Sequence, residues 1–381
     1  MSPIEPSSFM SQKAQGDATE SLNPQSFEKE KTPKPRIVNA ENIETNHNSE
    51  SAAELSLRPN NLNEYIGQER LKQILKIGIE AAIKRGDRSS VGHILLYGAP
   101  GLGKTSCAFL LAKMIGSQAH IFSAPSLDKP KDIVGVLMSL QEGDVLFIDE
   151  IHRLNKVTEE LLYPAMEDYV LDLSTGKGVS ARVTRLPLPK FVLVGATTKL
   201  GNISSPMRDR FTHVHRMEFY SEEELTTISL RTAKLLNFEL SPKGASIIAL
   251  RARGTPRIAN RLCRLVRDFI AHKDKELADE MLVEEALDLF RIDANGLDQT
   301  DRQMLKIIIE NYNGGPVGLD TLAVTLGEDN KTLEDYYEPF LIQCGFLERT
   351  PKGRKASAKA YKMLGFEYPG DLVDSNQTLL L

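Results

Sequence analysis

The chain has 381 residues, 41% of them apolar, which is enough for two or three domains with separate buried cores. No run of about 18 apolar residues and no apolar segment behind a basic start occurs, which argues against a membrane span or a secretory signal and favours a cytoplasmic protein. Cys107, Cys263 and Cys344 lie too far apart in sequence for a disulfide framework or a Cys-pair zinc site. The formal net charge of -5 means that any contact with nucleic acid depends on a local concentration of Lys and Arg.

Residues 1–52 are rich in Ser, Asn, Pro, Gln, Glu and Lys and contain few large apolar side chains. Such a segment buries too little apolar surface to fold, so the sequence predicts a disordered N-terminal tail. A transit peptide is the alternative interpretation, but those peptides avoid acids, and Glu5, Asp17 and Glu20 are among the acids here.

Between residues 53 and 220, short apolar runs alternate with helical patterns. Residues 94–97, 145–148 and 191–194 read as buried strands, and residues 106–115 read as a helix. This alternation predicts an α/β fold with a mostly parallel sheet covered by helices on both faces.

The segment after the first strand, GAPGLGKT at residues 98–105, fits the phosphate-loop pattern G-x-x-x-x-G-K-[ST]. Gly101 and Gly103 let backbone N–H groups wrap phosphates, and the following helix N-terminus adds its positive dipole end. Lys104 is predicted to neutralise the β- and γ-phosphates, and the Thr105 hydroxyl to bind Mg²⁺. The pattern therefore predicts ATP and Mg²⁺ as cofactors.

Residues 146–150, LFIDE, place two acids at the carboxyl end of a buried strand, where open parallel sheets bind their ligands. Asp149 is predicted to hold magnesium through water, and Glu150 to orient and deprotonate the water that attacks the γ-phosphate. The alternative is an acidic strand end that caps the next helix.

Two further features follow along the chain. Residues 169–173 and 179–183 flank a turn-rich segment and predict a β-hairpin inserted into the sheet domain. The strand at 191–194 leads to Thr197 and Thr198, either of which can supply a hydroxyl that senses the γ-phosphate, although a pair of threonines capping a turn is an equal alternative.

Arginines offer a contact with nucleotide across a subunit boundary. Arg208 and Arg210 surround Asp209, and an Arg directed at a neighbour's γ-phosphate stabilises transition-state charge, although a surface ion pair with Asp209 is the alternative. Arg257 lies just inside a predicted helix that begins at Pro256, from which it can reach a nucleotide.

The rest of the chain predicts two smaller domains and a tail. Residues 221–291 show helical periodicity without a strand pattern, and residues 292–370 have the helix, turn, helix and hairpin order of a winged helix. Residues 371–381 are predicted to be a flexible C-terminal tail. Basic side chains gather in the wing with no acid among them, which suits phosphates, although a solvated basic turn is the alternative. They are Arg349, Lys352, Arg354, Lys355, Lys359 and Lys362.

Taken together, these motifs resemble the RuvB family of AAA+ ATPases over residues 55–365. The resemblance is carried by LRP at 57–59, EYIGQ at 64–68, residues 144–154, LYPAMEDY at 162–169, residues 205–211, residues 254–260 and GGPVGLD at 314–320. It implies a large ATPase domain, a helical lid and a DNA-gripping winged-helix head. It also implies a homohexameric ring that works with RuvA and RuvC and drives branch migration of Holliday junction DNA in recombination, repair and the SOS response.

The resemblance also assigns residues to roles. Arg210 is implied to be the arginine finger, Arg257 a second sensor, and one of the threonines, Thr198 in our assignment, the first sensor. The hairpin at 169–183 is implied to dock onto RuvA, and Arg349, Arg354 and Lys331 to contact DNA. The nucleotide is implied to contact Leu57, Arg58, Gly101, Gly103, Lys104, Thr105, Ser106, Glu167, Asp168, Tyr169, Arg210, Tyr220 and Arg257.

Three departures from the family pattern stand out. Ala99 replaces a proline of the phosphate loop, Lys199 replaces the arginine after the threonine pair, and Asn330 stands where relatives carry a basic DNA contact, which leaves Lys331 as its substitute. Two other functions fit parts of the pattern less well. A protein-unfolding ring is disfavoured because the pore-loop pattern at 133–135 lacks its aromatic residue, and an ATP-dependent DNA-binding switch would lack processive hydrolysis.

Overall fold

The structure, a computed structural model, describes residues 37–38, 56–175 and 182–369. Apart from Ile37 and Val38, the predicted N-terminal tail lies outside the described residues, as do the predicted C-terminal tail and the hairpin tip at 176–181. Within the described part, no helix is long and apolar enough to cross a membrane.

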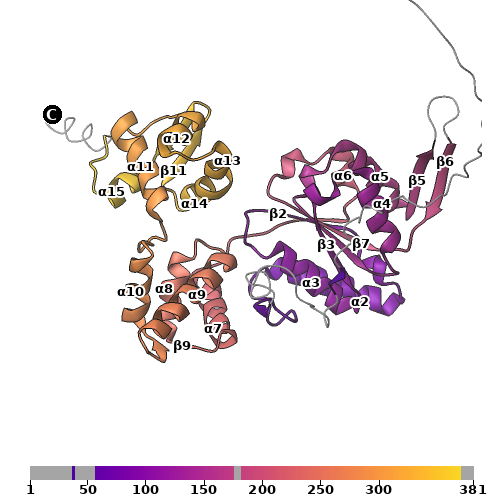
Figure 1. Cartoon of the computed structure of the whole chain (residues 1–381), viewed down its shortest axis with the longest axis horizontal. Helices are drawn as coiled ribbons and strands as arrows, with labels where there is room; N and C mark the ends of the chain where they lie inside the picture. Colours follow the sequence, from indigo (N-terminus) through magenta and orange to yellow (C-terminus); the bar gives the residue numbers. More distant parts are fainter. Residues whose placement is uncertain (1–36, 39–55, 176–181, 370–381) are drawn as a thin grey trace, which may run out of the picture. The chain divides into compact units, whose positions relative to one another are not determined.

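The first described domain is built on a six-stranded sheet of order β1-β3-β4-β7-β2-β8. Every neighbouring pair is parallel except β1 with β3. The strands are β1 (Ile37–Val38), β2 (Ile94–Tyr97), β3 (Ala119–Ser123), β4 (Val145–Asp149), β7 (Val192–Thr197) and β8 (His213–Arg216). The predicted parallel α/β sheet is therefore present (Figure 1).

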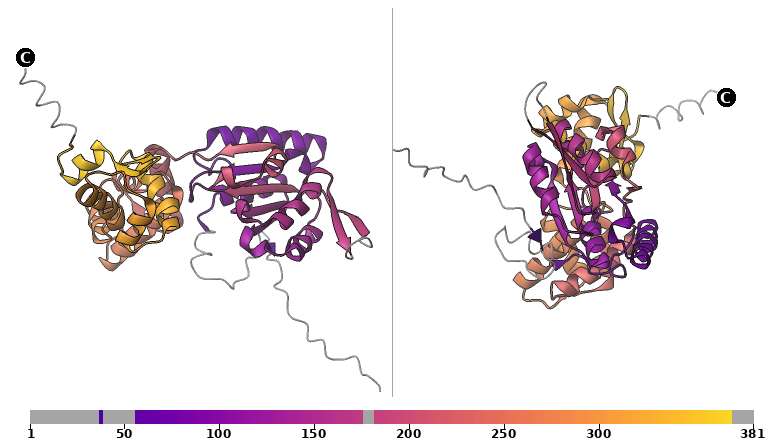
Figure 2. Two further views of the ribbon diagram at one scale, coloured as in Figure 1. Left: turned by 90° about the horizontal axis from the view of Figure 1, so that it is seen from above. Right: turned by 90° about the vertical axis from the view of Figure 1, so that its right-hand side faces the viewer.

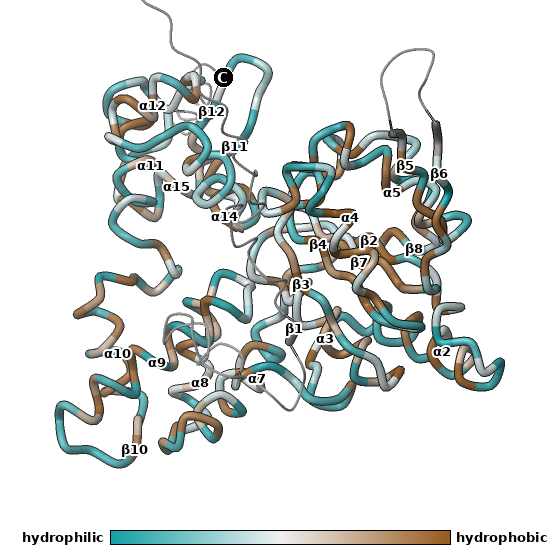
Figure 3. Tube along the Cα trace, turned by 45° about the vertical axis from the view of Figure 1, so that its right-hand side comes forward, coloured by the Kyte–Doolittle hydropathy of each residue, from teal (hydrophilic) through white to brown (hydrophobic). Residues whose placement is uncertain are grey.

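Helices cover both faces of this sheet. In Figure 2 helices lie on either side of the sheet. Apolar side chains of α2 and α3 share one core with one face, and those of α4 and α5 share a second core with the other. The central strands are hydrophobic along their length, as expected for strands buried on both faces (Figure 3). The helices and turns are α2 (Glu69–Arg85), η1 (Arg88–Val91), α3 (Lys104–Ile115), η2 (Ala124–Leu127), α4 (Pro130–Ser139), η3 (Ile151–Arg153), α5 (Lys156–Glu167), η5 (Leu200–Asn202) and α6 (Ser205–Asp209).

Three strands of the six-stranded sheet were not predicted. β3 was not recognised because it is short and contains the polar residue His120. His120 is buried and bonded to Asp144 at 2.8 Å, and hydrophobic periodicity cannot reveal such a partner. β8 is an edge strand on which side chains alternate between partly buried and exposed. β1 lies within the segment predicted to be a disordered tail, where two β-branched residues pair with the edge of β3.

The inserted hairpin is formed by β5 (Val170–Thr175) and β6 (Arg182–Pro187). Its pairing runs from Thr175 opposite Arg182 to Val170 opposite Pro187. The expected second strand at 179–183 is thus wrong in its bounds. Pairing extends four residues further, to Pro187, because Leu186 lies opposite the buried Leu171 and packs against the same core.

The second domain is helical, as predicted, and its core is shared by α7, α8, α9 and α10. It also contains two short strands, β9 and β10, which pair with each other in parallel. The sequence pattern did not reveal them. At two residues each, they are too short to show a period of two. The elements are α7 (Glu222–Leu235), β9 (Glu239–Leu240), α8 (Pro242–Arg251), α9 (Pro256–His272), β10 (Leu277–Ala278) and α10 (Glu280–Leu289).

The third domain has the predicted winged-helix order. Its second long helical segment, residues 333–343, is divided into a π-helical turn, η6, and α14, since Pro339 has no N–H to continue a regular helix. The wing is the antiparallel pair β11 and β12, in which Arg349 lies opposite Arg354. The elements are α11 (Gln299–Tyr312), α12 (Leu319–Leu326), α13 (Asn330–Thr332), η6 (Leu333–Tyr337), α14 (Glu338–Gln343), β11 (Leu347–Thr350), β12 (Gly353–Ala356) and α15 (Ala358–Leu364).

Arg253 connects the helical domain to the winged helix. Its guanidinium is 5% exposed, donates to the Gly296 carbonyl at 2.9 Å and to Asp298 at 3.0 Å, and forms an ion pair with the fully buried Asp301. Its Cζ lies 4.9 Å from the centre of the Phe340 ring. Arg253 therefore links the two domains through a buried network of polar contacts.

Candidate nucleotide-binding site

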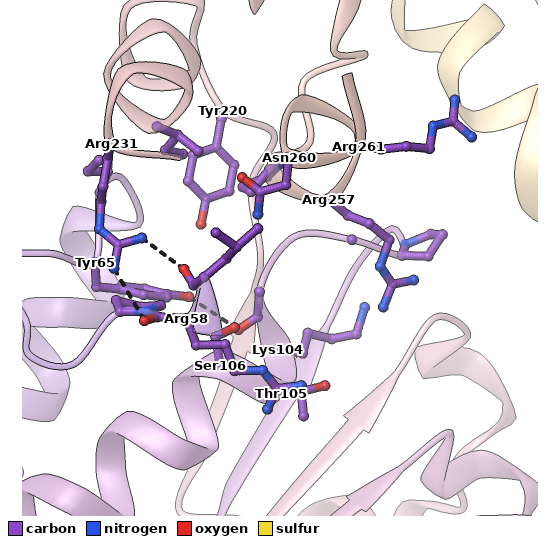
Figure 4. Close-up of a pocket in the computed structure, with 18 of the residues that line it drawn as sticks. Arg58, Tyr65, Lys104, Thr105, Ser106, Tyr220, Arg231, Arg257, Asn260 and Arg261 are labelled. Carbon is purple, nitrogen blue, oxygen red and sulfur yellow. Dashed lines mark hydrogen bonds between the residues drawn. The ribbon is translucent and has the colours of Figure 1, made fainter. Parts of the chain in front are cut away.

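A cavity of about 660 Å³ opens between the phosphate loop and the helical domain (Figure 4). Its volume lies in the range of pockets that enclose a small-molecule ligand. It is lined by Leu57, Arg58, Pro59, Glu64, Tyr65, Ile66, Pro100, Gly101, Gly103, Lys104, Thr105, Ser106, Asp149, Glu150, Tyr220, Ile228, Arg231, Pro256, Arg257, Asn260, Arg261, Arg264 and Leu265. Most of the residues expected to contact nucleotide therefore meet in one place.

The phosphate loop joins β2 to the N-terminus of α3. Gly101 and Gly103 have φ angles of 82° and 94°, which only glycine adopts without strain. Lys104 is buried, and its Nζ donates to the carbonyls of Gly98 and Ala99, both at 2.9 Å. Burial lowers the pKa of Lys104 to about 8, although the negative charges of Asp149 and Glu150 oppose this shift. An ammonium held this way is prepared to receive an anion.

Two tyrosines support the phosphate loop through its carbonyl groups. The Tyr220 hydroxyl donates to the Leu102 carbonyl at 3.2 Å, and the Tyr65 hydroxyl donates to the Gly103 carbonyl at 3.5 Å. Burial raises the pKa of both phenols, so they remain neutral donors at physiological pH. The role of Tyr65 was not predicted, because it depends on a contact with a residue 38 positions along the chain.

The acidic pair lies at the carboxyl end of β4, next to the end of β7. Asp149 and Glu150 both line the cavity, together with the Thr105 hydroxyl. Carboxylate and hydroxyl oxygens are the donors that Mg²⁺ takes when phosphates and water complete its shell, so this donor set fits the ion. Glu150 has a φ of 52°, a left-handed backbone conformation that is uncommon for residues other than glycine.

The threonines after β7 have different surroundings. Thr197 is fully buried, and its Oγ1 accepts the Lys199 N–H at 2.9 Å and lies 2.9 Å from Nδ1 of His152. Thr198 donates its hydroxyl to the Glu150 carboxylate at 3.4 Å. Thr198 is therefore the threonine that contacts Glu150, the predicted general base.

The helical domain closes the opposite side of the cavity. Arg257 packs directly on the phosphate loop, since a Cβ added to Gly101 would lie 3.0 Å from the Arg257 Cβ. Arg231 donates to the Leu57 carbonyl at 2.8 Å and the Arg58 carbonyl at 3.2 Å, and it pairs with Glu64 at 2.9 Å (Figure 4). Arg231 was not predicted, because its partners lie more than 160 positions away in the sequence.

Four residues expected at the nucleotide lie away from this cavity within the single chain. Arg210 pairs with Glu167 at 3.1 Å, donates to the Pro206 carbonyl at 2.7 Å, and stacks its guanidinium 4.3 Å from the centre of the Tyr163 ring. Asp168 caps the end of α5. The Tyr169 ring packs edge-on against Phe191 at the base of the hairpin. None of these four residues is among those that line this cavity in the described part of the chain.

The expected DNA contacts differ in their accessibility. The Arg349 side chain is 56% exposed and pairs with Glu334 at 3.2 Å, and Lys331 is exposed in α13. By contrast, Arg354 is buried and forms a two-point ion pair with the buried Glu338. Its charge is already neutralised inside the domain, so Arg354 is placed to shape the wing rather than to present a free cation.

Three family models match consecutive parts of the chain. They are the Holliday junction DNA helicase RuvB P-loop domain over residues 57–217, the RuvB AAA lid domain over 220–293 and the RuvB C-terminal winged helix domain over 294–365. Together they cover nearly all of the described residues.

Curated relatives and solved structures agree with these matches. The Holliday junction branch migration complex subunit RuvB of Nostoc punctiforme is 54% identical over 318 residues, covering 84% of this chain and 86% of the relative. Its counterpart from Synechococcus sp. strain CC9311 is 52% identical over 346 residues, covering 90% and 95%. The structure of the Thermotoga maritima RuvB Holliday junction branch migration motor aligns with a TM-score of 0.74 at 46% identity, covering 82% of this chain and all of that one.

We predict that Arg231→Met weakens nucleotide binding without a comparable loss of kcat. The substitution removes charged hydrogen bonds that hold residues 57–58 against the cavity, and the expected loss is about tenfold in affinity, or about 1.4 kcal/mol. Titration with a fluorescent ADP analogue measures the affinity. Arg267→Met is the matched control, because within the described residues the Arg267 side chain is bonded only to its exposed neighbour Asp268. Equal nucleotide affinities for the two variants would contradict the role of Arg231 in holding residues 57–58 at the cavity.

Proposed function

Because the chain belongs to the RuvB family of AAA+ ATPases, we propose that it uses ATP hydrolysis to drive branch migration of Holliday junction DNA. The observation that carries this proposal is the single cavity in which the phosphate loop, the acidic pair and the helical-domain arginines meet. We assign the large ATPase domain to residues 53–220, the lid to 221–291 and the head to 292–370.

In the proposed hydrolytic site, Lys104 and the loop N–H groups bind the phosphates of ATP. Thr105 and Asp149 would hold Mg²⁺, which supplies positive charge to the phosphate oxygens. Glu150 orients the attacking water and takes its proton, and Thr198 is positioned by its contact with Glu150 to report the state of the γ-phosphate. Leu57, Arg58, Ser106 and Tyr220 complete the nucleotide contacts, and Arg257 couples the lid to the phosphate loop.

Arg210 is proposed to act in trans. Its pairing with Glu167 and its stacking on Tyr163 keep it outside the cavity of its own chain, which supports action on an adjacent subunit's nucleotide. Glu167, Asp168 and Tyr169 lie on the same side of the domain as Arg210 or at the hairpin base, and we propose that they belong to that same subunit boundary. We propose a homohexamer, as the family resemblance implies, and a cytoplasmic location.

The remaining partners are proposed from the family. RuvA docks on the hairpin over residues 169–183, whose described strands project from the sheet domain (Figure 1), and RuvC joins the assembly at the junction. Arg349 and Lys331 contact DNA phosphates from the head, while Arg354 contributes by fixing the wing. Contacts of this kind hold a duplex without reading its sequence, as a motor that slides along DNA requires.

We predict that the wild-type protein dissociates a synthetic four-way junction with ATP and Mg²⁺ when RuvA is present. Glu150→Gln should bind a fluorescent ATP analogue normally and lose at least about 100-fold in turnover, since the general base is gone. Gel-resolved strand movement and phosphate release measure the two activities. Junction binding by the wild type without strand movement would instead favour an ATP-dependent assembly switch.

We predict that Arg210→Ala lowers ATP turnover by about 10³-fold or more with nucleotide still bound. Mixing it with Asp149→Asn should restore part of the activity, because some boundaries then combine an intact Asp149 with a neighbour's intact Arg210. Arg208→Ala is the matched control two residues earlier and should remain active, since among the described residues its guanidinium hydrogen-bonds to the nearby Ser205 hydroxyl alone. No recovery at any mixing ratio would argue against action in trans.

We predict that Arg349→Ala weakens junction binding and reduces the slope of log K against log salt by about 0.9 for each phosphate that the variant no longer neutralises. Fluorescence anisotropy at several salt concentrations measures the slope. Lys306→Ala, which changes an exposed pair with Glu310 elsewhere in the head, should leave it unchanged. Arg354→Met is not an equivalent test of DNA binding. It leaves Glu338 buried and unpaired, so we expect it to destabilise the head by about 3–5 kcal/mol. An unaltered slope for Arg349→Ala would remove it from the DNA contacts.

A further inference from the structure

His152 lies two residues after the proposed catalytic base and touches it. Its Nε2 is 3.4 Å from Oε2 of Glu150, and its Nδ1 is 2.9 Å from Oγ1 of Thr197. The imidazole is 9% exposed, and Thr197 is fully buried. The ring therefore forms a bridge between the carboxylate at the end of β4 and the hydroxyl at the end of β7.

The contacts of Thr197 favour one of the two neutral forms of the His152 ring. Thr197 Oγ1 already accepts the Lys199 N–H at 2.9 Å, so its own hydroxyl hydrogen is free to be donated to His152 Nδ1. An Nδ1 that accepts a hydrogen bond leaves the proton of the neutral imidazole on Nε2, the atom that faces Glu150. Burial lowers the pKa of His152, with Lys199, Arg153 and Lys331 acting in the same direction and Glu150 opposing it, which favours this neutral form.

Among the described residues, the two side-chain contacts of the Glu150 carboxylate involve the same oxygen. Both His152 and Thr198 meet Oε2. We therefore assign the attacking water molecule to Oε1. The left-handed backbone of Glu150, φ 52°, begins the short η3 turn that carries His152 back onto the carboxylate. Strained backbone of this kind persists where surrounding contacts hold it.

Two other buried histidines in this domain, His93 and His120, serve as a comparison, because their contacts are purely structural. His93 is bonded on both ring nitrogens to backbone groups, the Met166 carbonyl and the Leu193 N–H. His120 pairs with Asp144, whose carboxylate also accepts two backbone N–H groups. The partners of these two histidines lie outside the nucleotide cavity, whereas the carboxylate that His152 touches lines it.

We propose that His152 is a positioning residue for ATP hydrolysis, which orients the Glu150 carboxylate through Nε2 and is itself oriented by the Thr197 hydroxyl. This inference rests on the proposed role of Glu150. It also links the two polar strand ends directly, because a shift of Thr197 at the end of β7 is transmitted to the base through one rigid ring.

The test compares His152→Ala, His152→Gln and His152→Asn with the wild type and with Glu150→Gln. Steady-state ATP hydrolysis gives kcat and KM, and a fluorescent ADP analogue gives the nucleotide affinity. We expect His152→Ala to lower kcat by about 10- to 100-fold, since a displacement of the base by about 1 Å costs up to about 100-fold. Nucleotide affinity should stay close to that of the wild type, because His152 does not line the cavity.

The conservative variants separate positioning from folding. The amide nitrogen of Gln reaches the place of Nε2 and should recover part of kcat, whereas that of the shorter Asn mimics Nδ1 and should not. Thr197→Val should lower kcat as His152→Ala does, Thr197→Ser should retain activity, and combining Thr197→Val with His152→Ala should add little, because both break one chain of contacts.

The outcomes distinguish this inference from the function on which it rests. Full turnover by Glu150→Gln would overturn the role of Glu150 and this inference with it. An inactive Glu150→Gln beside a His152→Ala variant with unchanged kcat would overturn the positioning role alone. Equal losses of kcat for the Gln and Asn variants, accompanied by weaker nucleotide binding, would show that His152 only supports the fold.

Discussion

The parallel pairing of β4, β7 and β2 is the constraint on which the site depends. Because these strands are adjacent and run in one direction, everything that follows each of them must emerge at the same edge of the sheet. The phosphate loop after β2, the acidic pair after β4 and the threonines after β7 therefore converge, although nearly 100 positions separate the first from the last. Register makes the convergence close, since Tyr97 lies opposite Thr197 and Ile148 opposite Gly195.

That edge places polar groups where water is scarce, and each needs a partner to remain there. Lys104 bonds to two carbonyls of its own loop, and Thr197 bonds to a backbone N–H and an imidazole. Glu150 accepts from a hydroxyl and lies 3.4 Å from the same imidazole. The same ammonium, hydroxyl and carboxylate groups are the ones that can bind phosphate or activate water. Phosphate oxygens arriving at Lys104 would replace the loop carbonyls as its acceptors, so nucleotide binding exchanges one set of partners for another rather than leaving a charge unpaired.

The sequence was sufficient wherever the signal is local. The phosphate loop, the three apolar strands and the order of elements in the winged helix are each encoded within a few residues, and the structure has them. What could not be predicted depends on contacts between distant segments. Arg231 holds residues 57–58, Tyr65 supports the phosphate loop, and His152 meets Thr197 only because β4 and β7 are neighbours. The charge of Arg354 was interpreted from a run of basic residues, which cannot reveal that Glu338, 16 positions earlier, would neutralise it.

The strengths of the domain contacts indicate where movement is least costly. The lid and head are joined through Arg253, whose buried guanidinium donates to Gly296 and Asp298 and pairs with the fully buried Asp301. The large domain meets the head through Lys199, Glu334 and Asp335, whose side chains are about one-third exposed, and pairs of that kind contribute about 0–1 kcal/mol. Between the large domain and the lid lies the nucleotide cavity itself, spanned by hydrogen bonds of Arg231 and the packing of Arg257. A nucleotide-dependent change should therefore open or close that cavity and release the Lys199 contacts, while the lid carries the head with it as one body.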